Sequence, residues 1–194
     1  HDAQVIAFAM YAGNMKVARE VINAIPRKRL FTQIEPDGKQ PHELRRTLAF
    51  GYSQFNLSHF IDIFMMARKI GISIDNATSE DGRSFYKAMD FLVPYVGKDV
   101  KAWPYQQISE WKYKQQEFCK DLYRTFLLNP ERKDYLKLYK THRIIDWKDR
   151  FNLLWMEADD VDNAYAFACG QLQFAMQCAA KARKEADNQC KHRV

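Results

Sequence analysis

Apolar side chains fill most positions of one long segment, residues 48–70. They recur at a helical spacing, at Leu48, Phe50, Phe55, Leu57, Phe60, Ile61, Ile63, Phe64, Met65 and Ile70. Apolar residues on nearly every side are typical of a helix that other elements surround. Gly71 then ends the segment. We therefore expect an inner helix from Leu48 to Ile70, with Phe60 and Phe64 buried.

Shorter segments with the same period lie on both sides of it. The pattern predicts helices over residues 3–12, 15–25, 84–93, 108–128, 131–139, 146–156 and 160–188. Gly13 and Asn14 separate the first two helices. Pro26, with the basic residues that follow it, is predicted to end the second. Ser84 is suited to cap the helix that begins after it.

The fold class predicted from this pattern is all-α. No segment alternates apolar and polar residues over the length of a strand. Helix pairs of unequal length joined by polar loops favour part of an α/α toroid, a ring of helical hairpins. A solenoid of helical repeats is the alternative, although no fixed period and no tetratricopeptide consensus is visible.

The connection over residues 32–46 is the most polar one between two helices. Its Pro-Asp-Gly sequence at 36–38 is typical of a tight turn, because proline presets φ and glycine tolerates positive φ. Pro41 disfavours helix at the residue before it. We expect a shaped loop over residues 33–42, and such loops on a rigid scaffold often carry binding groups. A polar surface loop without such a role has the same composition.

The longest motif of the chain is Gln-Ile-Glu-Pro-Asp-Gly-Lys-Gln-Pro-His-Glu-Leu-Arg-Arg-Thr at residues 33–47, followed by Tyr52 and Ser53. With residues 2–14 and 81–95, this motif resembles the alginate lyase domain family of helical polysaccharide lyases. The similarity runs from residue 2 to about residue 139. It implies that residues 1–194 are the C-terminal portion of a single α/α-toroid lyase domain in a longer protein, with 140–194 helical and unassigned. The polar loop would lie at one mouth of the ring.

The resemblance also implies a reaction, β-elimination on a polymer of uronic acids. The sugar carboxylate must be neutralised, a base must take the C5 proton, and an acid must protonate the leaving O4. Tyr52 matches the family's tyrosine, which is expected to serve as base and then as acid. Arg46 suits the neutralising or base-supporting role, because arginine stays cationic and binds carboxylates through two parallel bonds.

One arginine can supply the energy needed to lower the pKa of a tyrosine into the range of a useful base. Moving an ordinary tyrosine pKa from ~10 to ~7 or 8 needs about 3 to 4 kcal/mol. One arginine ~4 Å away, at an effective dielectric of ~20, supplies about that much. On one regular helix Arg45, not Arg46, would share the face of Tyr52. We choose Arg46 because it precedes Thr47 as in the family pattern, and a helix that begins after it leaves its direction free.

Further positions are candidates for substrate binding. Gln33, Gln40 and Glu43 match the signature and could either line a sugar cleft or hold the loop in shape. Aromatic residues in a second polar connection could stack on sugar rings, although core packing is the commoner fate: Trp103, Tyr105 and Trp111. Of these we choose Tyr105. His59 is interpreted as a satisfied core histidine.

The family pattern also places an Asn-Asn-His motif a few residues before the position of Asp2. His1 does not match that histidine and is assigned no role.

Charge and composition limit the classes of molecule that this chain is expected to bind. The net charge of +6 permits attraction to polyanions. Neither a block of basic residues nor a nucleic-acid motif is present, so we expect an acidic polysaccharide or oligosaccharide as the partner and no nucleic acid.

No apolar run reaches the ~20 residues of a membrane span. The four cysteines lack metal-ligand spacing, so we expect ordinary thiols, no metal and no cofactor. The oligomeric state is left open.

Two other classes of function remain open. A glycoside hydrolase needs two carboxylates ~5 to 9.5 Å apart across a cleft, and Glu35 and Asp37 share a single turn. A non-catalytic helical binding module needs no arginine and tyrosine pair at all. If the chain is part of a lyase that degrades a polymer, the resemblance implies export, to the periplasm or the medium.

Overall fold

The computed structural model describes residues 1–144 and 149–151. The chain divides into two compact units, His1–Ile144 and Ile145–Val194, and the first is described here. Its elements are all helical: α1 Asp2–Tyr11, α2 Met15–Ile25, η1 Pro26–Leu30, α3 Phe31–Gln33, α4 Pro41–Leu44, α5 Ala49–Lys69, α6 Phe85–Leu92, η2 Val93–Tyr95, η3 Val100–Ala102, α7 Trp111–Leu128 and α8 Lys133–His142. Extended pairing within the described residues is limited to two isolated bridges. The all-α class is confirmed.

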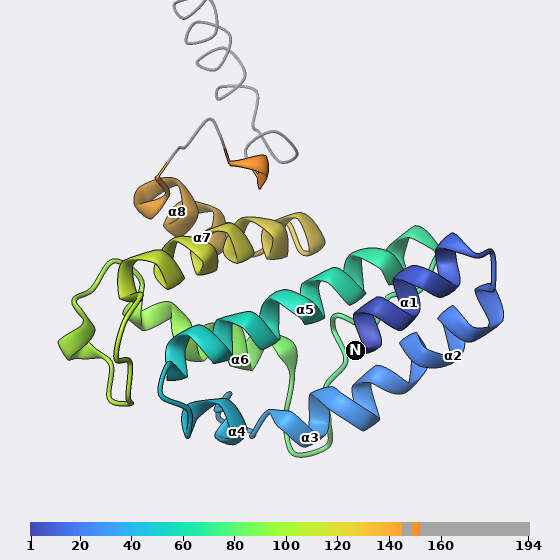
Figure 1. Ribbon diagram of the computed structural model, residues 1–194, viewed down its shortest axis with the longest axis horizontal. Helices are drawn as coiled ribbons and strands as arrows, with labels where there is room; N and C mark the ends of the chain where they lie inside the picture. The colour runs from blue at the N-terminus through green and yellow to red at the C-terminus, as the bar shows by residue number, and fades with distance from the viewer. Residues whose placement is uncertain (145–148, 152–194) are drawn as a thin grey trace, which may run out of the picture. The chain divides into compact units, whose positions relative to one another are not determined.

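Helix α5 is the central element, as the apolar pattern predicts. It lies between α7 and α6, and α1 runs beside its C-terminal half (Figure 1). Phe60 and Phe64 are buried, and the Phe64 ring meets the Phe85 ring of α6 edge to face, with centroids 5.0 Å apart. Phe55 is the exception, with 55% of its surface exposed. The prediction that other elements surround this helix on nearly every side therefore does not hold at Phe55.

Helices α1 and α2 form the predicted hairpin. Gly13 adopts a positive φ of 73° between them, and the Asn14 side chain caps α2 by accepting the Val17 N–H at 3.2 Å. Helix α2 ends at Ile25, before Pro26, as predicted, but the helical path does not end there. The chain continues through η1, a single π-type turn, into α3. Pro26 is in the first position of this turn, and Leu30 at its end is buried.

The polar loop is built around a tight turn. The Gly38 N–H donates to the Glu35 carbonyl at 2.9 Å, the Glu35 N–H donates to the Lys39 carbonyl at 2.8 Å, and Asp37 Oδ1 accepts the Lys39 N–H at 3.0 Å. Gly38 has a φ of +88°, and a Cβ there would lie 2.1 Å from the Lys87 carbonyl oxygen of α6. The predicted turn is confirmed, although the non-helical loop is shorter than residues 33–42, because α3 and α4 take both ends.

In the second half of the unit the helices lie where the sequence pattern predicts them, but their ends are shifted. Ser84 caps α6 by accepting the Lys87 N–H at 3.2 Å. Helix α7 begins at Trp111, three residues later than predicted, and α8 at Lys133, two residues later. The predicted helices over 146–156 and 160–188 lie outside the described residues except at 149–151. The prediction that residues 1–194 form one domain, with the polar loop at the mouth of a ring, stays a prediction.

Two absences hold for the described residues. No helix among them is long and apolar enough to cross a membrane, and no group of three metal-ligating side chains occurs among them. Cys119 is a free, buried thiol, and burial raises its pKa to about 12.

Candidate active site

Arg46 and Tyr52 are in contact. The guanidinium carbon of Arg46 lies 3.9 Å from the centre of the Tyr52 ring. This is possible because Arg46 lies in the turn between α4 and α5, before α5 begins at Ala49. The 120° offset that a single helix would impose does not apply. A cation over the face of an aromatic ring is electrostatically attracted to it.

Arg45 turns the other way. Its Nε donates to the Pro41 carbonyl at 3.2 Å, and its Nη2 lies 2.9 Å from His42 Nδ1. Both partners belong to α4, so Arg45 is an exposed residue that closes the C-terminal end of its own short helix. The choice of Arg46 over Arg45 as the neighbour of Tyr52 agrees with this geometry.

A second segment, residues 106–108, holds the start of α5 and brings α7 to it. The Ala49 N–H donates to the Gln106 carbonyl at 2.9 Å, and the Ile108 N–H donates to the Thr47 carbonyl at 3.2 Å. The side-chain oxygen of Gln107 accepts the Phe50 N–H at 3.1 Å. Gln107 therefore satisfies a free N–H of the first helical turn, as a capping residue does, although it lies far away in sequence.

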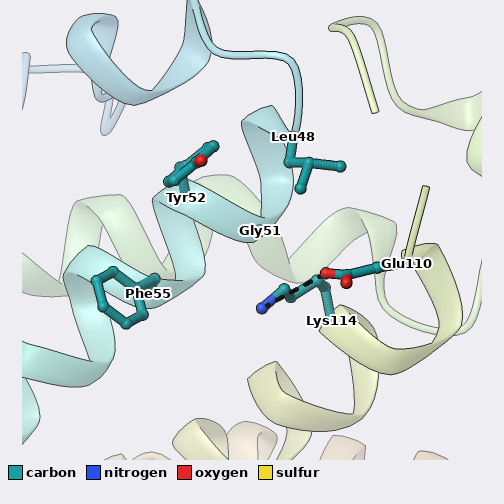
Figure 2. A pocket seen from close by; sticks show the side chains of 6 residues that line it. All are labelled: Leu48, Gly51, Tyr52, Phe55, Glu110 and Lys114. Carbon is teal, nitrogen blue, oxygen red and sulfur yellow. Dashed lines mark ion pairs between the residues drawn. The ribbon is translucent and has the colours of Figure 1, made fainter. Parts of the chain in front are cut away.

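Tyr52 lines a pocket of about 230 Å³ between α5 and the start of α7. Its walls are Leu48, Gly51, Tyr52, Phe55, Glu110 and Lys114 (Figure 2). Lys114 Nζ lies 3.9 Å from Glu110 Oε2. Glu110 has a φ of +60°, which is left-handed backbone that non-glycine residues seldom adopt. Glu110 and Lys114 were not predicted at this site from the sequence. Their i,i+4 spacing suggests an ion pair, but not its position beside Tyr52.

The two signature glutamines meet at Asn56. The Asn56 Nδ2 donates to Gln33 Oε1 at 3.2 Å and to Gln40 Oε1 at 2.8 Å, and Gln40 Nε2 donates to the Ser53 carbonyl at 3.3 Å. Gln40 is 1% exposed. Because it is buried in this structure, the Gln40 side chain is not accessible to a sugar. Its hydrogen bonds hold the loop against α5. Gln33 is half-buried, and its contact with substrate stays a prediction.

Glu43 and Tyr105 are not among the residues that line the pocket. Glu43 is half-buried in α4, and its carbonyl accepts the Arg46 N–H at 3.0 Å. Tyr105 is half-buried, with its ring centre 5.2 Å from that of Trp103. Trp103 itself is buried against Phe50, so it belongs to the core. Sugar binding by Glu43 and Tyr105 stays a prediction.

His59 is not a core residue, contrary to the sequence interpretation. It is half-buried, its Nδ1 lies 2.9 Å from the Phe55 carbonyl oxygen, and its ring centre lies 4.3 Å from that of Phe55. It supports the exposed Phe55 ring on one face of α5.

A buried carboxyl group joins α7 to α5. Gln54 Nε2 donates to Asp121 Oδ2 at 2.6 Å, and Arg124 Nη1 donates to Asp121 Oδ1 at 3.3 Å. Burial raises the pKa of Asp121 to about 7, although the nearby Arg124 and the hydrogen bond from Gln54 act in the opposite direction. This contact ties the two helices that form the walls of the pocket.

Comparison with known proteins assigns the chain to a family. The family model described as alginate lyase matches residues 1–103, which is more than half of the chain. The chain belongs to the alginate lyase family. A solved structure, an alginate lyase from Bacteroides ovatus, is 46% identical with a TM-score of 0.77, and the match covers 80% of this chain and 41% of that one. No curated protein matches.

The family assignment confirms the resemblance stated from the motifs, and the similar structure supports the toroid class. The match to the alginate lyase family model ends at residue 103 of this chain. Helix α7, which carries Lys114, therefore lies beyond the matched region. The chain spans less than half of the length of the Bacteroides ovatus alginate lyase.

Proposed function

We propose that this chain carries part of the active site of a polysaccharide lyase that cleaves a 1,4-linked uronate polymer by β-elimination. The observation that carries the proposal is the Arg46 guanidinium 3.9 Å from the centre of the Tyr52 ring, at a pocket that Tyr52 lines. Membership of the alginate lyase family supports the same reaction. Alginate or polymannuronate is the proposed substrate, with glucuronan as the next polymer to test.

Tyr52 would act as base and then as acid. Its phenolate oxygen takes the proton from C5, the C–H electrons form the C4–C5 double bond, and the C4–O4 bond breaks. The phenol then returns its proton to O4, so that tyrosine ends the cycle as it began. No further reactant is needed, and the product is an unsaturated uronate at the new chain end.

Arg46 would supply positive charge where negative charge forms. The negative charge of a phenolate spreads into its ring, so a guanidinium over that ring stabilises the phenolate more than the neutral phenol. Arg46 is exposed, so the same cation can also meet the carboxylate of an incoming sugar. Arginine can satisfy a carboxylate with two parallel hydrogen bonds.

The hydrolase alternative finds less support. Asp37 Oδ2 is paired with Lys39 Nζ at 2.7 Å, and the hydrogen bond from Lys39 lowers the Asp37 pKa. A hydrolase requires a carboxylic acid with a raised pKa as its general acid. Glu35 lies in the same turn, so the two carboxyl groups do not face each other across a cleft.

The proposed location is the periplasm or the medium. A polymeric uronate is too large to enter the cytoplasm intact, so an enzyme that cuts the polymer would act outside it. Fractionation of cells that express the intact protein tests this point. Recovery of the whole protein in the cytosol would favour oligosaccharides as substrates.

The test of function uses the intact protein and three polymers: alginate, glucuronan and a neutral glucan. A lyase produces a new ultraviolet-absorbing double bond with every new reducing end, whereas a hydrolase produces reducing ends alone. We expect both signals together on a uronate polymer and neither on the glucan. Reducing ends without ultraviolet absorbance would overturn the lyase assignment, and no cleavage of either uronate polymer would favour a binding module.

A further inference from the structure

Lys114 brings a cation to the lining of the Tyr52 pocket, whereas Arg46 contacts the Tyr52 ring and does not line that pocket. Its carbon stem passes over Gly51, where an added Cβ would lie 3.1 Å from Lys114 Cγ. The absence of a side chain at Gly51 therefore opens the path that the lysine follows. In Figure 2 the nitrogen end of Lys114 is directed toward the side of the pocket where Phe55 lies.

The Lys114 charge is only loosely held by the protein. Glu110 Oε2 is 3.9 Å from Nζ, beyond hydrogen-bond distance, and the Glu110 side chain is 51% exposed. The Lys114 side chain is 21% exposed, so the pair is half-buried on the lysine side, but a separation of 3.9 Å leaves it without a hydrogen bond. Within residues 1–144 no group accepts a hydrogen bond from Lys114 Nζ. The three N–H donors of the ammonium group are thus free to bind an anion.

One exposed aromatic ring shares the pocket with Lys114, and a second lies beside its ammonium group. Phe55 lines the same pocket and is 55% exposed, and Tyr113 is 57% exposed. The centre of the Tyr113 ring lies 5.0 Å from Lys114 Nζ. The Phe55 ring is supported from behind by His59. A flat, fixed and exposed aromatic ring beside a cation matches the two faces of a uronate, an apolar C–H face and a carboxylate.

The geometry points to a subsite for one uronate residue, in which Phe55 stacks on the sugar ring and Lys114 binds its carboxylate. Phe55 and Tyr52 lie three positions apart and share a face of α5, so this sugar would be a neighbour of the one that reacts at Tyr52. The pocket is smaller than the ~300 to 1,000 Å³ of sites for drug-sized ligands, which suits a single sugar residue. The inference rests on the proposed function for the identity of the polymer.

The experiment measures binding without turnover. The intact protein with Tyr52→Phe is titrated in a calorimeter with saturated oligosaccharides from acid hydrolysis of alginate, and with the same oligosaccharides after carboxyl reduction. Lys114→Met, Lys114→Arg and Phe55→Leu are added singly to that background. Lys112→Met is the matched control, because it removes the same charge from an exposed position of α7 about 200° around the helix.

We expect Lys114→Met to weaken binding of the acidic oligosaccharide by about 10- to 100-fold, as loss of a charge-assisted hydrogen bond does. The reduced oligosaccharide should bind Lys114→Met and the parent equally. Lys114→Arg should restore much of the loss, and Lys112→Met should change little. Phe55→Leu should weaken both ligands by the same factor, because stacking does not depend on the carboxylate.

Two results would overturn the inference: unchanged affinity of Lys114→Met for the acidic oligosaccharide, or an equal loss for the acidic and reduced forms, which would give Lys114 a structural role. Failure of the proposed function is read separately, from the absence of unsaturated product with the unmodified protein. The binding comparison is decided whether or not that product is seen.

Discussion

Arg46 stacks on Tyr52 from outside the helix that carries the tyrosine, with 3.9 Å between the guanidinium carbon and the ring centre. The contact depends on the turn after α4, which ends at Leu44, and on the late start of α5 at Ala49. The main chain between the two helices thus fixes where the positive charge lies.

Tyr52→Phe should abolish elimination while leaving binding of substrate nearly intact. The change removes one hydroxyl group and almost no packing surface. A group that transfers protons contributes ~10²- to 10⁴-fold, so kcat of the intact protein should fall by at least that range, with a far smaller change in KM. Formation of unsaturated uronate is the measurement. Turnover at the wild-type rate would make Tyr52 a structural residue.

Arg46→Ala should lower kcat and also weaken binding, whereas Arg45→Ala should alter the chemical step little. The two substitutions remove the same charge from adjacent exposed residues, and only Arg46 lies over Tyr52. Arg45 is engaged with Pro41 and His42 of its own helix. Steady-state kinetics of both variants against a uronate polymer make the comparison. Equal losses of kcat and of binding in the two variants would show that Arg46 acts only through the net charge of the protein.

Gly38→Ala should destabilise the polar loop much more than Gly71→Ala destabilises the end of α5. Both glycines have positive φ, +88° and +75°, so each alanine meets the left-handed penalty of about 1 to 2 kcal/mol. At Gly38 the new Cβ would also lie 2.1 Å from the Lys87 carbonyl oxygen, whereas nothing lies within 4 Å at Gly71.

The thermal midpoint of each glycine variant is the measurement. Gly38→Ala should lower it by clearly more than Gly71→Ala, and should also reduce turnover, because the loop leads directly into α4 and Arg46. If the two midpoints fall equally, the close approach of the loop to α6 does not contribute to stability.

Asp121→Asn should flatten the dependence of stability on pH between about 4 and 7. The folded pKa of Asp121 is raised to about 7, above the ~3.9 of an unfolded aspartate. In that window the folded state keeps a proton that the unfolded state has lost, so stability falls as pH rises, by on the order of a few kcal/mol. Below it both states are protonated, and above it both are ionised.

The measurement is the thermal midpoint of the parent and of Asp121→Asn at several pH values from 4 to 8. The asparagine can still accept the hydrogen bond from Gln54, and it has no proton to lose. We expect the variant to gain stability relative to the parent as pH rises, and the two curves to become parallel above pH ~8. Parallel curves throughout would show that Asp121 does not titrate in this window.

Local sequence was sufficient wherever a short stretch of chain satisfies its own backbone. The turn at residues 35–39 closes through Gly38 and Asp37, and Ser84 caps its own helix. The apolar content of residues 48–70 predicted a central helix because burial of that surface leaves few other arrangements. The pairing of Tyr52 with Arg46 came from the resemblance, and regular helix geometry alone would have favoured Arg45.

Tertiary structure decided what depends on contacts between distant segments. The bonds between residues 47–49 and 106–108 bring Lys114 and Glu110 to Tyr52, and no local pattern encodes that pairing. The exposure of Phe55 depends on which neighbours α5 has on each side. Within residues 1–144 the sequence by itself determined the longer helices, the turn and the family, because these follow from local periodicity and motif. Which cations and rings share the pocket was decided by packing, since long-range contacts alone fix the distances between side chains on different helices.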